Sequence, residues 1–484
     1  MEPLFQLRIT LPGRGSRSLR SSLHGQLRAA ILEGRLKPGV RLPSTRSWPA
    51  LYGISRNTAV AAYDLLLSEG YLTARRGSGT VVAGVAVRAP DPPAPVGRRA
   101  AARRIAAYWL RQRSNHLAGS GATPRFAFQL GIPDLARFPF DVWRRLTCRA
   151  MRRLRGAPPV TPDGRGEEAL REAIARHVSF ARAVACRAAD VVVTAGAQQA
   201  FDLLARVLAL RGRDCVAMEN PGYFALRAAF EAHGSKVAPV AVDAEGLMVE
   251  RIAARARVVC VTPSHQFPLG TVMSAQRRLM LLEHCRRRGA VVIEDDYDAE
   301  FRFVDRPLDA LQTLDSSQSV FYVGTFSKSL APDLRLGYIV SPPWAVAALA
   351  AAKRVADGHS SSIAQAALAC MIAEGHLARH VRRMQRIYQR RRELLLGGLR
   401  ANFEGRLVPL PSVAGLHVTA QLAASCSESR VVENARRLGV QVSALGPFYA
   451  GAPAMRGLVL GYGNIDESAI EEGLRRLRQS LPEA

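Results

Sequence analysis

One lysine of this chain stands where a reactive amine would be useful. Only four of the 67 basic residues are lysines, and Lys328 directly follows SVFYVGTFS (319–327), a run rich in β-branched and aromatic residues. Such a run is typical of a buried β-strand. Arginine cannot lose its proton in a protein, so a lysine at a strand end in an arginine-rich chain indicates a need for a deprotonatable amine.

Two further strand-like runs lead to groups that could work with that amine. AVVIED (290–295) ends in Asp295, and Tyr297 follows two residues later. VVVTAG (191–196) leads into a helical pattern whose first backbone N–H groups form an anion site, at Gly196, Ala197 and Gln198. Together these groups meet the needs of pyridoxal 5′-phosphate. Lysine forms the imine, aspartate pairs the pyridinium nitrogen, tyrosine reaches the phenolate oxygen, and the helix start holds the phosphate.

These residues need a scaffold that brings strand ends together. From about residue 124, short apolar runs alternate with helical patterns such as 197–210 and 275–289. The alternation predicts an α/β fold with a mostly parallel sheet. Ligands of such sheets bind at the carboxyl ends of the strands, where the residues above stand. The remaining strand-like runs are CVAM (215–218) and VVCVTP (258–263).

Residues 126–480 resemble a class I/II aminotransferase domain of fold type I. GTFSKSLAPDLRLGY (324–338) resembles the lysine segment of that family, and VVIEDDYDAEF (291–301) resembles its pyridinium segment. The resemblance implies an internal aldimine on Lys328, with Asp295 at the ring nitrogen and Tyr297 at O3′. It also implies an α/β large lobe at about 160–345 and a smaller α+β lobe that includes the C-terminus.

The same resemblance implies further cofactor contacts. Phosphate contacts are expected from Arg335, Thr325 and Ser327. MENPGYF (218–224) places Tyr223 where an aromatic ring stacks on the cofactor. TPSHQFPLGTVM (262–273) resembles the segment that supplies a polar side chain near O3′, for which we choose Gln266.

One departure from the family bears on the ligand. MRGLVLGYGNID (455–466) aligns with a segment in which an arginine clamps the substrate α-carboxylate through two hydrogen bonds. Val459 stands at that position, and the nearest arginine is Arg456. Either Arg456 replaces the clamp, or the ligand is not an ordinary α-amino acid. The second alternative includes pyridoxal phosphate itself as the signal.

The first 84 residues follow a different pattern. Apolar residues recur every four positions from Leu19 to Ile31 and predict a helix that stops at Gly34. A second helix is expected from Ser44 to about Leu51, a third within 52–72, and a basic hairpin at 74–84. The inward residues of the third helix are expected to be Val60, Tyr63 and Leu67. This order is typical of a winged helix-turn-helix, whose third helix enters the major groove of DNA.

Residues 19–83 resemble a GntR-type DNA-binding domain. The wording of that family recurs as LPSTR (42–46), SRNT (55–58), EGYL (69–72) and RRGSGT (75–80). Arginine can pair with guanine and asparagine with adenine, which suits the start of the third helix. The resemblance implies DNA contacts at Ser44, Arg46, Arg56, Asn57, Thr58, Arg76 and Gly77. Trp48-Pro49 departs from the family, because a proline inside the second helix would remove a helical bond and kink it.

Charge is distributed unevenly along the chain. The net charge is +27, and residues 1–120 carry +14 of it, from 19 basic and 5 acidic residues. A basic end indicates a polyanion partner there, most simply nucleic acid, although a general arginine bias is the alternative. We expect the DNA-binding domain at 15–84, a linker that contains PDPPAP at 85–123, and the aminotransferase-like domain at 124–484.

Other kinds of site and location find no support in the sequence. The seven cysteines form no CxxC pair and indicate buried thiols in a reducing compartment. The first 30 residues lack a signal-peptide pattern, and the longest apolar run, at 342–352, is too short to span a bilayer. The histidines show no metal-ligand spacing. We therefore expect a cytoplasmic protein without a metal site or a membrane partner.

A GntR-type domain, a linker and an aminotransferase-like domain, in this order, resemble the MocR/GabR type of bacterial transcription regulator. The resemblance implies a homodimer that binds operator DNA and senses an amine, an amino acid or pyridoxal phosphate itself through aldimine chemistry at Lys328. The alternative is a working aminotransferase with an appended DNA-binding domain, because Lys328, Asp295 and Tyr297 keep half-transamination chemically open. The absent carboxylate arginine and the intact SRNT helix favour a regulator without physiological turnover.

Overall fold

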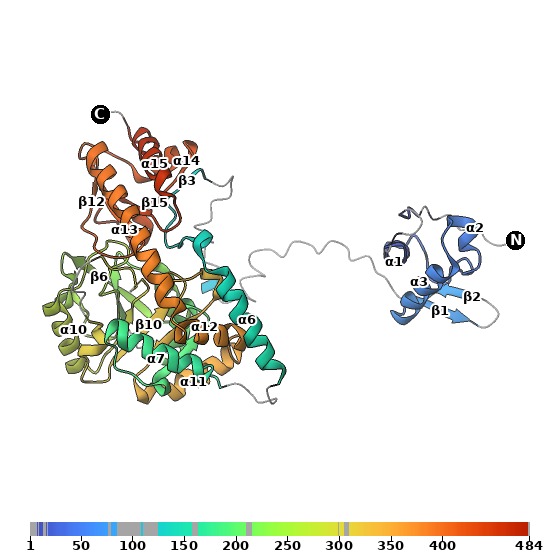
Figure 1. The fold of residues 1–484 in the computed structure, drawn as a ribbon, viewed down its shortest axis with the longest axis horizontal. Helices are drawn as coiled ribbons and strands as arrows, with labels where there is room; N and C mark the ends of the chain where they lie inside the picture. Colours follow the sequence, from blue (N-terminus) through green and yellow to red (C-terminus); the bar gives the residue numbers. More distant parts are fainter. Residues whose placement is uncertain are drawn as a thin grey trace. The chain divides into compact units, whose positions relative to one another are not determined.

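The chain forms two compact units, Met1–Arg111 and Gln112–Ala484 (Figure 1). The computed structural model describes residues 7, 9–12, 16, 18–75, 79–84, 108–109, 124–156, 163–209, 215–298, 300–303 and 309–482. Of the expected linker at 85–123, only Tyr108 and Trp109 are described. The domain boundaries drawn from the sequence therefore stay a prediction.

The first unit is a small helical domain with a two-stranded wing. Its elements are α1 (Leu19–Leu32), α2 (Trp48–Tyr52), α3 (Arg56–Ser68), β1 (Leu72–Arg75) and β2 (Gly79–Val82). The two strands pair antiparallel, as the hairpin pattern predicted. A single apolar core joins the elements and includes Leu23, Leu27, Trp48, Tyr63 and Leu66. The winged helix-turn-helix order predicted from the sequence is confirmed.

The second helix corrects one expectation. It begins at Trp48 rather than Ser44, with Ser47 as its N-cap residue and Pro49 in its first turn. A proline there costs nothing, because the first N–H groups of a helix have no intrahelical acceptor. The departure at Trp48-Pro49 therefore shortens α2 to five residues and does not kink it.

The buried face of α3 also differs from the expected one. Ala59, Ala62, Tyr63 and Leu66 are buried, whereas Val60 and Leu67 are only half-buried. The two alanines give α1 room to pack against α3, so the small residues and not Val60 face the core.

The second unit is built on an eight-stranded, mostly parallel sheet. The strand order is β4-β11-β10-β9-β8-β5-β6-β7. Strands β4, β11 and β10 pair antiparallel, as do β6 and β7, and the other neighbours pair parallel. The bounds are β4 (Val191–Thr194), β5 (Cys215–Asn220), β6 (Lys236–Asp243), β7 (Gly246–Leu247), β8 (Ala256–Val261), β9 (Val291–Asp295), β10 (Val320–Thr325) and β11 (Gly337–Val340). All five strand-like runs picked from the sequence are strands of this sheet.

Helices cover both faces of the sheet (Figure 1). Strand residues such as Val192 and Ile293 pack in one cluster with Phe201 and Leu349. Their neighbours Val191 and Val292 belong to clusters on the opposite face. This alternation of burial along each strand produces a three-layer α/β core. The helices are α6 (Phe140–Arg155), α7 (Glu168–Arg182), α8 (Ala197–Leu208), α9 (Phe224–Ala232), α10 (Ala275–Arg288), α11 (Pro343–Asp357) and α12 (Ser362–Ala373).

A smaller α+β lobe completes the second unit. Its four-stranded antiparallel sheet has the order β12-β13-β16-β15, and a separate parallel pair joins β14 to β3. The elements are β3 (Phe126–Ala127), α13 (His376–Asn402), β12 (Leu407–Pro409), β13 (His417–Leu422), α14 (Glu428–Arg437), β14 (Val440–Gln441), β15 (Ser443–Ala444), β16 (Gly457–Gly461) and α15 (Glu467–Gln479). The two-lobed fold expected from the resemblance is confirmed.

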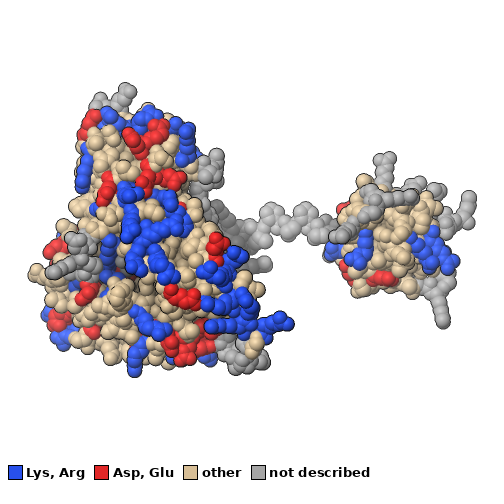
Figure 2. All heavy atoms as spheres, in the orientation of Figure 1, with Lys and Arg blue, Asp and Glu red and all other residues tan. Residues whose placement is uncertain are grey.

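The long helix α13 presents basic side chains to solvent. Figure 2 shows lysine and arginine side chains gathered on the face of the second unit over which α13 runs. The exposed arginines of this helix are Arg379, Arg382, Arg383, Arg386, Arg390 and Arg400. Its opposite side carries the buried residues Leu377, Met384 and Tyr388. These arginines therefore form the outer face of an amphipathic helix.

Two expectations drawn from the sequence concern the cysteines and the apolar segments, and the structure addresses both. All seven cysteines are free, and four of them are buried, but Cys148 is exposed, contrary to the expectation of buried thiols. Among the described residues, no helix combines the length and the apolar character needed to cross a membrane.

A buried chain of two hydrogen bonds fixes the start of the short helix α2 to α3 and to the preceding turn. Trp48 donates from Nε1 to the Tyr63 hydroxyl at 2.9 Å, and that hydroxyl donates to the Pro43 carbonyl at 2.8 Å. Tyr63→Phe leaves the indole N–H and the carbonyl without partners, so we expect it to lower the free energy of unfolding of the first unit by about 1–3 kcal/mol. Urea denaturation measures this loss.

Tyr52→Phe is the matched control for that substitution. The Tyr52 hydroxyl donates to the Leu7 carbonyl in a half-buried position, so its removal should cost about 1 kcal/mol or less. Equal losses for the two variants would contradict the importance assigned to the Trp48–Tyr63–Pro43 chain.

Candidate functional site

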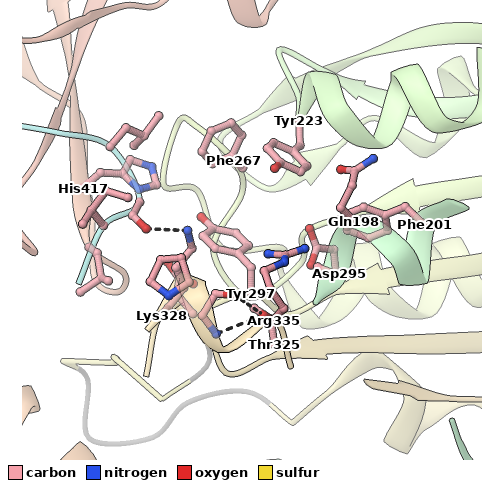
Figure 3. Close-up of a pocket in the computed structure, with 18 residues that line it drawn as sticks. Gln198, Phe201, Tyr223, Phe267, Asp295, Tyr297, Thr325, Lys328, Arg335 and His417 are labelled. Atoms are coloured by element: carbon pink, nitrogen blue, oxygen red, sulfur yellow. Dashed lines mark hydrogen bonds between the residues drawn. The ribbon is translucent and has the colours of Figure 1, made fainter. Parts of the chain in front are cut away.

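A cavity of about 240 Å³ opens at the carboxyl ends of the central strands. Asp295 ends β9 and Thr325 ends β10, while Ala197 and Gln198 begin the helix that follows β4 (Figure 3). The loop after β10 brings Ser327 and Lys328 to the same cavity, and Tyr223, Tyr297 and Arg335 also line it. Sequence segments more than 130 residues apart thus meet because parallel strands end at one edge of the sheet.

One end of the cavity is a cradle for an anion. Arg335 has a left-handed backbone conformation, with φ of 50°, and its Nη2 donates to the Ala195 carbonyl at 2.6 Å. Gly196 lies under the guanidinium, and a Cβ on this glycine would lie 2.9 Å from Nη2. Only glycine therefore lets the guanidinium reach the start of α8, where N–H groups and the helix dipole favour negative charge.

Two hydroxyl groups lie on the strand side of that cradle. The Thr325 hydroxyl donates to the Ser327 Oγ at 3.0 Å, and the Ser327 N–H donates back to the Thr325 Oγ1 at 3.1 Å. The pair is held by its own hydrogen bonds at the end of β10, on its last residue and in the loop that follows. Hydroxyls, backbone N–H groups and a guanidinium are the groups that proteins use to hold a phosphate.

The floor of the cavity holds a carboxyl group without a partner. Asp295 is 4% exposed, and its Oδ1 is buried with no hydrogen-bond partner among the described residues. Burial, followed by the nearby Asp296 and Asp298, raises the pKa of Asp295 well above its ordinary value. A buried carboxylate needs a cationic or hydrogen-bonding partner, so this position demands one from a bound molecule.

Lys328 faces the same cavity from the opposite side. Its Nζ donates to the Gly131 carbonyl at 2.6 Å, and burial lowers the pKa of the amine. A Cβ on Gly131 would lie 2.7 Å from that Nζ, so this glycine leaves the lysine room to lie in the cavity. A lowered pKa increases the neutral, nucleophilic fraction of the amine.

Aromatic and imidazole groups form the outer part of the cavity. Tyr223 packs edge-on against Phe267, with ring centroids 5.5 Å apart. The Tyr297 hydroxyl lies 2.9 Å from the His265 Nδ1 and 3.1 Å from the His265 carbonyl oxygen. The same Nδ1 lies 2.8 Å from the Asp298 Oδ2. Tyr297 is therefore supported by a buried histidine–aspartate pair.

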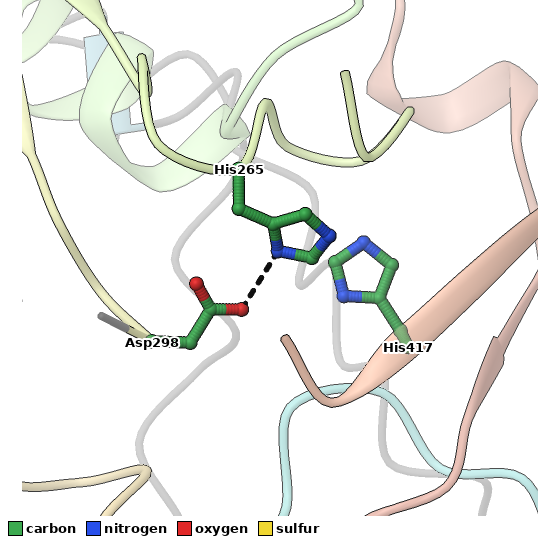
Figure 4. Close-up of side chains that lie close together, drawn as sticks. All are labelled: His265, Asp298 and His417. Carbon is green, nitrogen blue, oxygen red and sulfur yellow. Dashed lines mark hydrogen bonds and ion pairs between the residues drawn. The ribbon is translucent and has the colours of Figure 1, made fainter. Parts of the chain in front are cut away.

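The histidine–aspartate pair is part of a cluster that could hold a metal ion. The ligand atoms of His265, Asp298 and His417 all lie within 4.8 Å of one another (Figure 4). However, His265 and Asp298 are bound to each other, and the His417 Nε2 lies 3.1 Å from the Pro268 carbonyl oxygen. Burial, followed by His265, lowers the pKa of His417 well below its ordinary value, so this ring is neutral. We interpret the cluster as a hydrogen-bonded support for Tyr297.

The first unit presents polar groups at the start of α3. Ser55 caps this helix by accepting a hydrogen bond from the Thr58 N–H at 3.1 Å, which leaves Arg56 and Asn57 exposed. Ser44 and Arg46 are exposed in the preceding turn, where the Ser44 hydroxyl bonds to the Ser47 hydroxyl at 2.8 Å. The wing residues Arg76 and Gly77 lie outside the described residues.

Known proteins match both units of the chain. Residues 131–477 match the family of aminotransferases of class I and II, and residues 19–82 match bacterial regulatory proteins of the gntR family. The probable rhizopine catabolism regulatory protein MocR of Rhizobium meliloti is 38% identical, over 96% of this chain and 94% of its own. The chain belongs to the MocR/GabR type of transcription regulators.

Two further comparisons support both halves of this assignment. The pyridoxine biosynthesis transcriptional regulator PdxR of Corynebacterium glutamicum is 31% identical over 99% of each chain. The structure of Pyrococcus horikoshii kynurenine aminotransferase, solved with PMP, has a TM-score of 0.71 at 26% identity and covers 78% of this chain and 96% of that protein. Pyridoxal 5′-phosphate is accordingly the cofactor of this MocR-type regulator, and the unpaired Asp295 oxygen and the Arg335–Gly196 cradle fit its two ends.

One residue chosen from the sequence does not face the MocR-type pocket. Gln266 is buried, and its Nε2 donates to the carbonyl oxygens of Pro221 and Phe267 at 2.8 and 2.7 Å. Its Oε1 accepts from the Leu269 N–H at 3.1 Å. The amide thus joins its own turn to the loop after β5, and the neighbouring Phe267 lines the cavity instead. We withdraw Gln266 as a contact to O3′.

The arginine near the C-terminus does not replace the carboxylate clamp. Arg456 is exposed, and its Nη1 donates to the Ala424 carbonyl at 2.9 Å. Val459 is fully buried on β16, between Thr419 and Ser443 of the neighbouring strands. Arg456 is not among the described residues that line the cavity, so the first of the two alternatives drawn from the sequence has no support from its position.

Sequence reasoning missed the ion pairs behind the cavity floor. The Arg182 Nε donates to the Asp296 Oδ2 at 2.7 Å, and the Tyr322 hydroxyl donates to the same oxygen at 2.8 Å. Burial would raise the pKa of Asp296, but Arg182 and Arg302 outweigh it and hold the pKa at about 2. The second aspartate of the sequence EDDYD was the available signal, because two adjacent buried carboxylates need different partners.

Asp296→Asn should destabilise the second unit by about 3–5 kcal/mol, because it leaves the buried Arg182 without its charged partner. The folded-state pKa of Asp296 lies below its unfolded value of about 3.9, so its stabilisation is present above about pH 4 and is lost as the pH falls towards 2. Urea denaturation at pH 7 and pH 4 followed by acid titration measures both effects.

Asp163→Asn is the matched control for that prediction. Asp163 pairs with Arg165 at an exposed position, so its loss should cost less than about 1 kcal/mol. A comparable cost for the two variants would show that Asp296 is not held in the buried network described here.

Proposed function

We propose that this protein is a transcription regulator that binds operator DNA through its first unit and senses a small effector at a pyridoxal 5′-phosphate site in its second. One observation carries the proposal. The Lys328 amine, the unpaired Asp295 oxygen and the Arg335–Gly196 cradle share a single cavity in a chain whose full-length relatives are named as regulators.

We assign each lining group a role toward the cofactor. Arg335, Thr325, Ser327 and the start of α8 at Gly196, Ala197 and Gln198 hold the phosphate. Asp295 supplies the negative charge that a protonated ring nitrogen requires, and the ring in turn satisfies the buried Oδ1. Tyr297 donates its hydroxyl to O3′, positioned by the His265–Asp298 pair. Tyr223 packs beside the ring.

Bound pyridoxal phosphate supplies an aldehyde carbon that reacts reversibly with primary amines. Lys328 would hold this position in the resting protein, because burial lowers the pKa of its amine and so increases the neutral fraction. An effector amine bound there would leave the Lys328 amine on the Gly131 carbonyl, which is the contact that it makes in this structure. Such an exchange would change the position of the Lys328 side chain. A regulator needs a ligand with different affinity for two states of the protein, and this movement provides the difference.

The DNA contacts are assigned to the exposed start of α3 and the turn before it. Arg56 and Asn57 extend from the capped helix start, which is the part of a recognition helix that reaches base edges. Thr58, Ser44 and Arg46 are placed to contact phosphates. The wing at Arg76 and Gly77 is assigned on sequence resemblance alone.

Assembly and location follow from the regulator type. We propose a homodimer, since the resemblance to MocR/GabR-type regulators implies one, and dimers match the symmetry of two half-sites on an operator. Work on operator DNA places the protein in the cytoplasm of a bacterium. The alternative is a working aminotransferase with an appended DNA-binding domain. The observation that favours it is that Lys328 and Asp295 both line the cavity.

Lys328→Ala should abolish the visible absorption band of the protein–cofactor complex, because the covalent link to the lysine is lost. We also expect this variant to lose the change in operator affinity that an amine effector produces in the wild-type protein. Absorbance spectroscopy with added pyridoxal phosphate measures the first effect, and fluorescence anisotropy on a labelled operator fragment measures the second.

Lys236→Ala is the control, because Lys236 is exposed at the start of β6 and should leave both readouts unchanged. An unaltered band in the Lys328 variant would refute the assignment of the lysine. Sustained amino-group transfer between an amino acid and a keto acid by the wild-type protein would favour the aminotransferase alternative.

Arg56→Ala should weaken operator binding by about 1–3 kcal/mol and relax the preference at one base position. The reason is that a guanidinium at the helix start pairs with one guanine through two hydrogen bonds. Anisotropy titrations on a set of singly substituted operators measure the pattern. Arg35→Ala removes the same charge at another exposed position of the first unit and serves as the control. A uniform loss across all operators would make Arg56 a phosphate contact.

A further inference from the structure

We propose that the effector is a primary amine that carries no carboxylate and is uncharged away from its amino group. The inference rests on the proposed function, because it concerns the ligand of the same cofactor site. It is argued from the charges and the apolar surfaces that the chain places around the cavity.

The described residues that line the cavity include no spare cation for a carboxylate. Among the described residues that line it, the two cationic side chains are Lys328 and Arg335. The Arg335 guanidinium is fixed against Gly196 and the Ala195 carbonyl at the anion cradle. Lys328 occupies the position of the reacting amine. Neither group is left to receive a carboxylate at the outer end of the cavity.

The strand that could supply an arginine supplies an apolar cluster instead. Val459 packs in a cluster with Phe267, Leu445, Phe448 and Tyr449. Phe267 lines the cavity, so this cluster forms the support of its outer wall. A charged group in this cluster would lose its water without gaining a partner of opposite charge, which is costly.

Two arginines of the smaller lobe make contacts elsewhere. The buried Arg391 donates from Nη1 to the Gly463 carbonyl at 2.6 Å and from Nη2 to the Asp134 Oδ2 at 2.7 Å. Arg456 lies at the exposed edge of the small lobe and is bound to the Ala424 carbonyl. Neither arginine is among the described residues that line the cavity.

The outer wall is apolar with two hydrogen-bonding groups. Leu130, Ile132 and Leu416 line the cavity, as does Phe267. The polar groups there are the neutral ring of His417 and the carboxyl group of Asp298. A ligand carboxylate would lie near Asp298 and lose water without gaining a cation. A hydroxyl group or an alkyl chain would meet hydrogen-bonding groups and apolar surface, which suit it.

Matched amine pairs test the inference on the full-length, cofactor-loaded protein. The probes are 3-aminopropan-1-ol against β-alanine and ethanolamine against glycine, which differ only in a CH₂OH or a carboxylate. The change in the visible absorption band gives the affinity of each, and anisotropy gives its effect on operator binding. We expect each amino alcohol to bind at least roughly tenfold more tightly than its amino acid.

Two outcomes would overturn the inference. One is binding of either amino acid as tightly as its alcohol, and the other is a response of operator affinity to pyridoxal phosphate but to none of the amines. A protein without any cofactor band would instead refute the proposed function, which is a different result.

Substitutions in the cavity wall test whether its lack of a cation sets the preference between amino alcohols and amino acids. Ile132→Arg places a guanidinium on a half-buried part of the outer wall, and Ile132→Gln adds similar polarity without charge. We expect the arginine variant to shift the preference toward the amino acids by roughly tenfold relative to the glutamine variant. The absence of a shift would mean that the site already neutralises a carboxylate, against the proposal. Arg456→Ala should change neither affinity; a selective loss of amino-acid binding in this variant would also overturn it.

Discussion

The second unit depends on a carboxyl group that the chain itself does not satisfy. Asp295 is buried at the end of β9, beside two other aspartates, and one of its oxygens has no hydrogen-bond partner among the described residues. Such a group is costly, because it has lost its water and gained repulsion. Asp296 is compensated by Arg182 immediately beneath, so the two neighbours have opposite pKa shifts. The nearby Lys328 amine offsets only part of this cost, because the pKa of Asp295 stays well above its ordinary value. A protonated pyridine nitrogen is a cation of the kind that would compensate the rest.

The strands of the sheet place the other groups of the cavity around Asp295. Each proposed cofactor group stands within a few residues of a strand end, so a local pattern in the sequence could identify it. Lys328, Asp295 and the start of α8 were predicted for this reason, and the structure brings them together in one cavity. The same logic predicted five of the eight strands of this sheet, because buried strands are continuous apolar runs that are visible without any knowledge of their partners.

Groups outside the strands could not be predicted in this way. Gln266 lies in a turn, where no alternation of apolar and polar residues fixes the direction of a side chain. Its amide donates to the Pro221 and Phe267 carbonyls and does not face the cavity. His265 and Asp298 meet His417 from segments 33 and 119 residues away from one another, so no local spacing reveals their cluster. In the first unit, Pro49 was read as an interruption because the start of α2 was placed too early. Each error concerns where a side chain points or where an element begins, and neither is encoded by residue type alone.

The contrast between the two ends of the cavity explains how one fold can serve as a sensor. An aminotransferase must position an amino acid by its carboxylate through many turnovers, so it needs a cation at the outer end as well as the cradle at the inner end. Here the inner end keeps its guanidinium, its glycine and its helix start, while the outer end is apolar and is supported by Val459. A sensor needs only that the ligand amine exchanges with Lys328 and alters the protein. Retention of the cofactor groups together with loss of the substrate clamp is therefore what selection for binding, rather than for turnover, would leave in this fold.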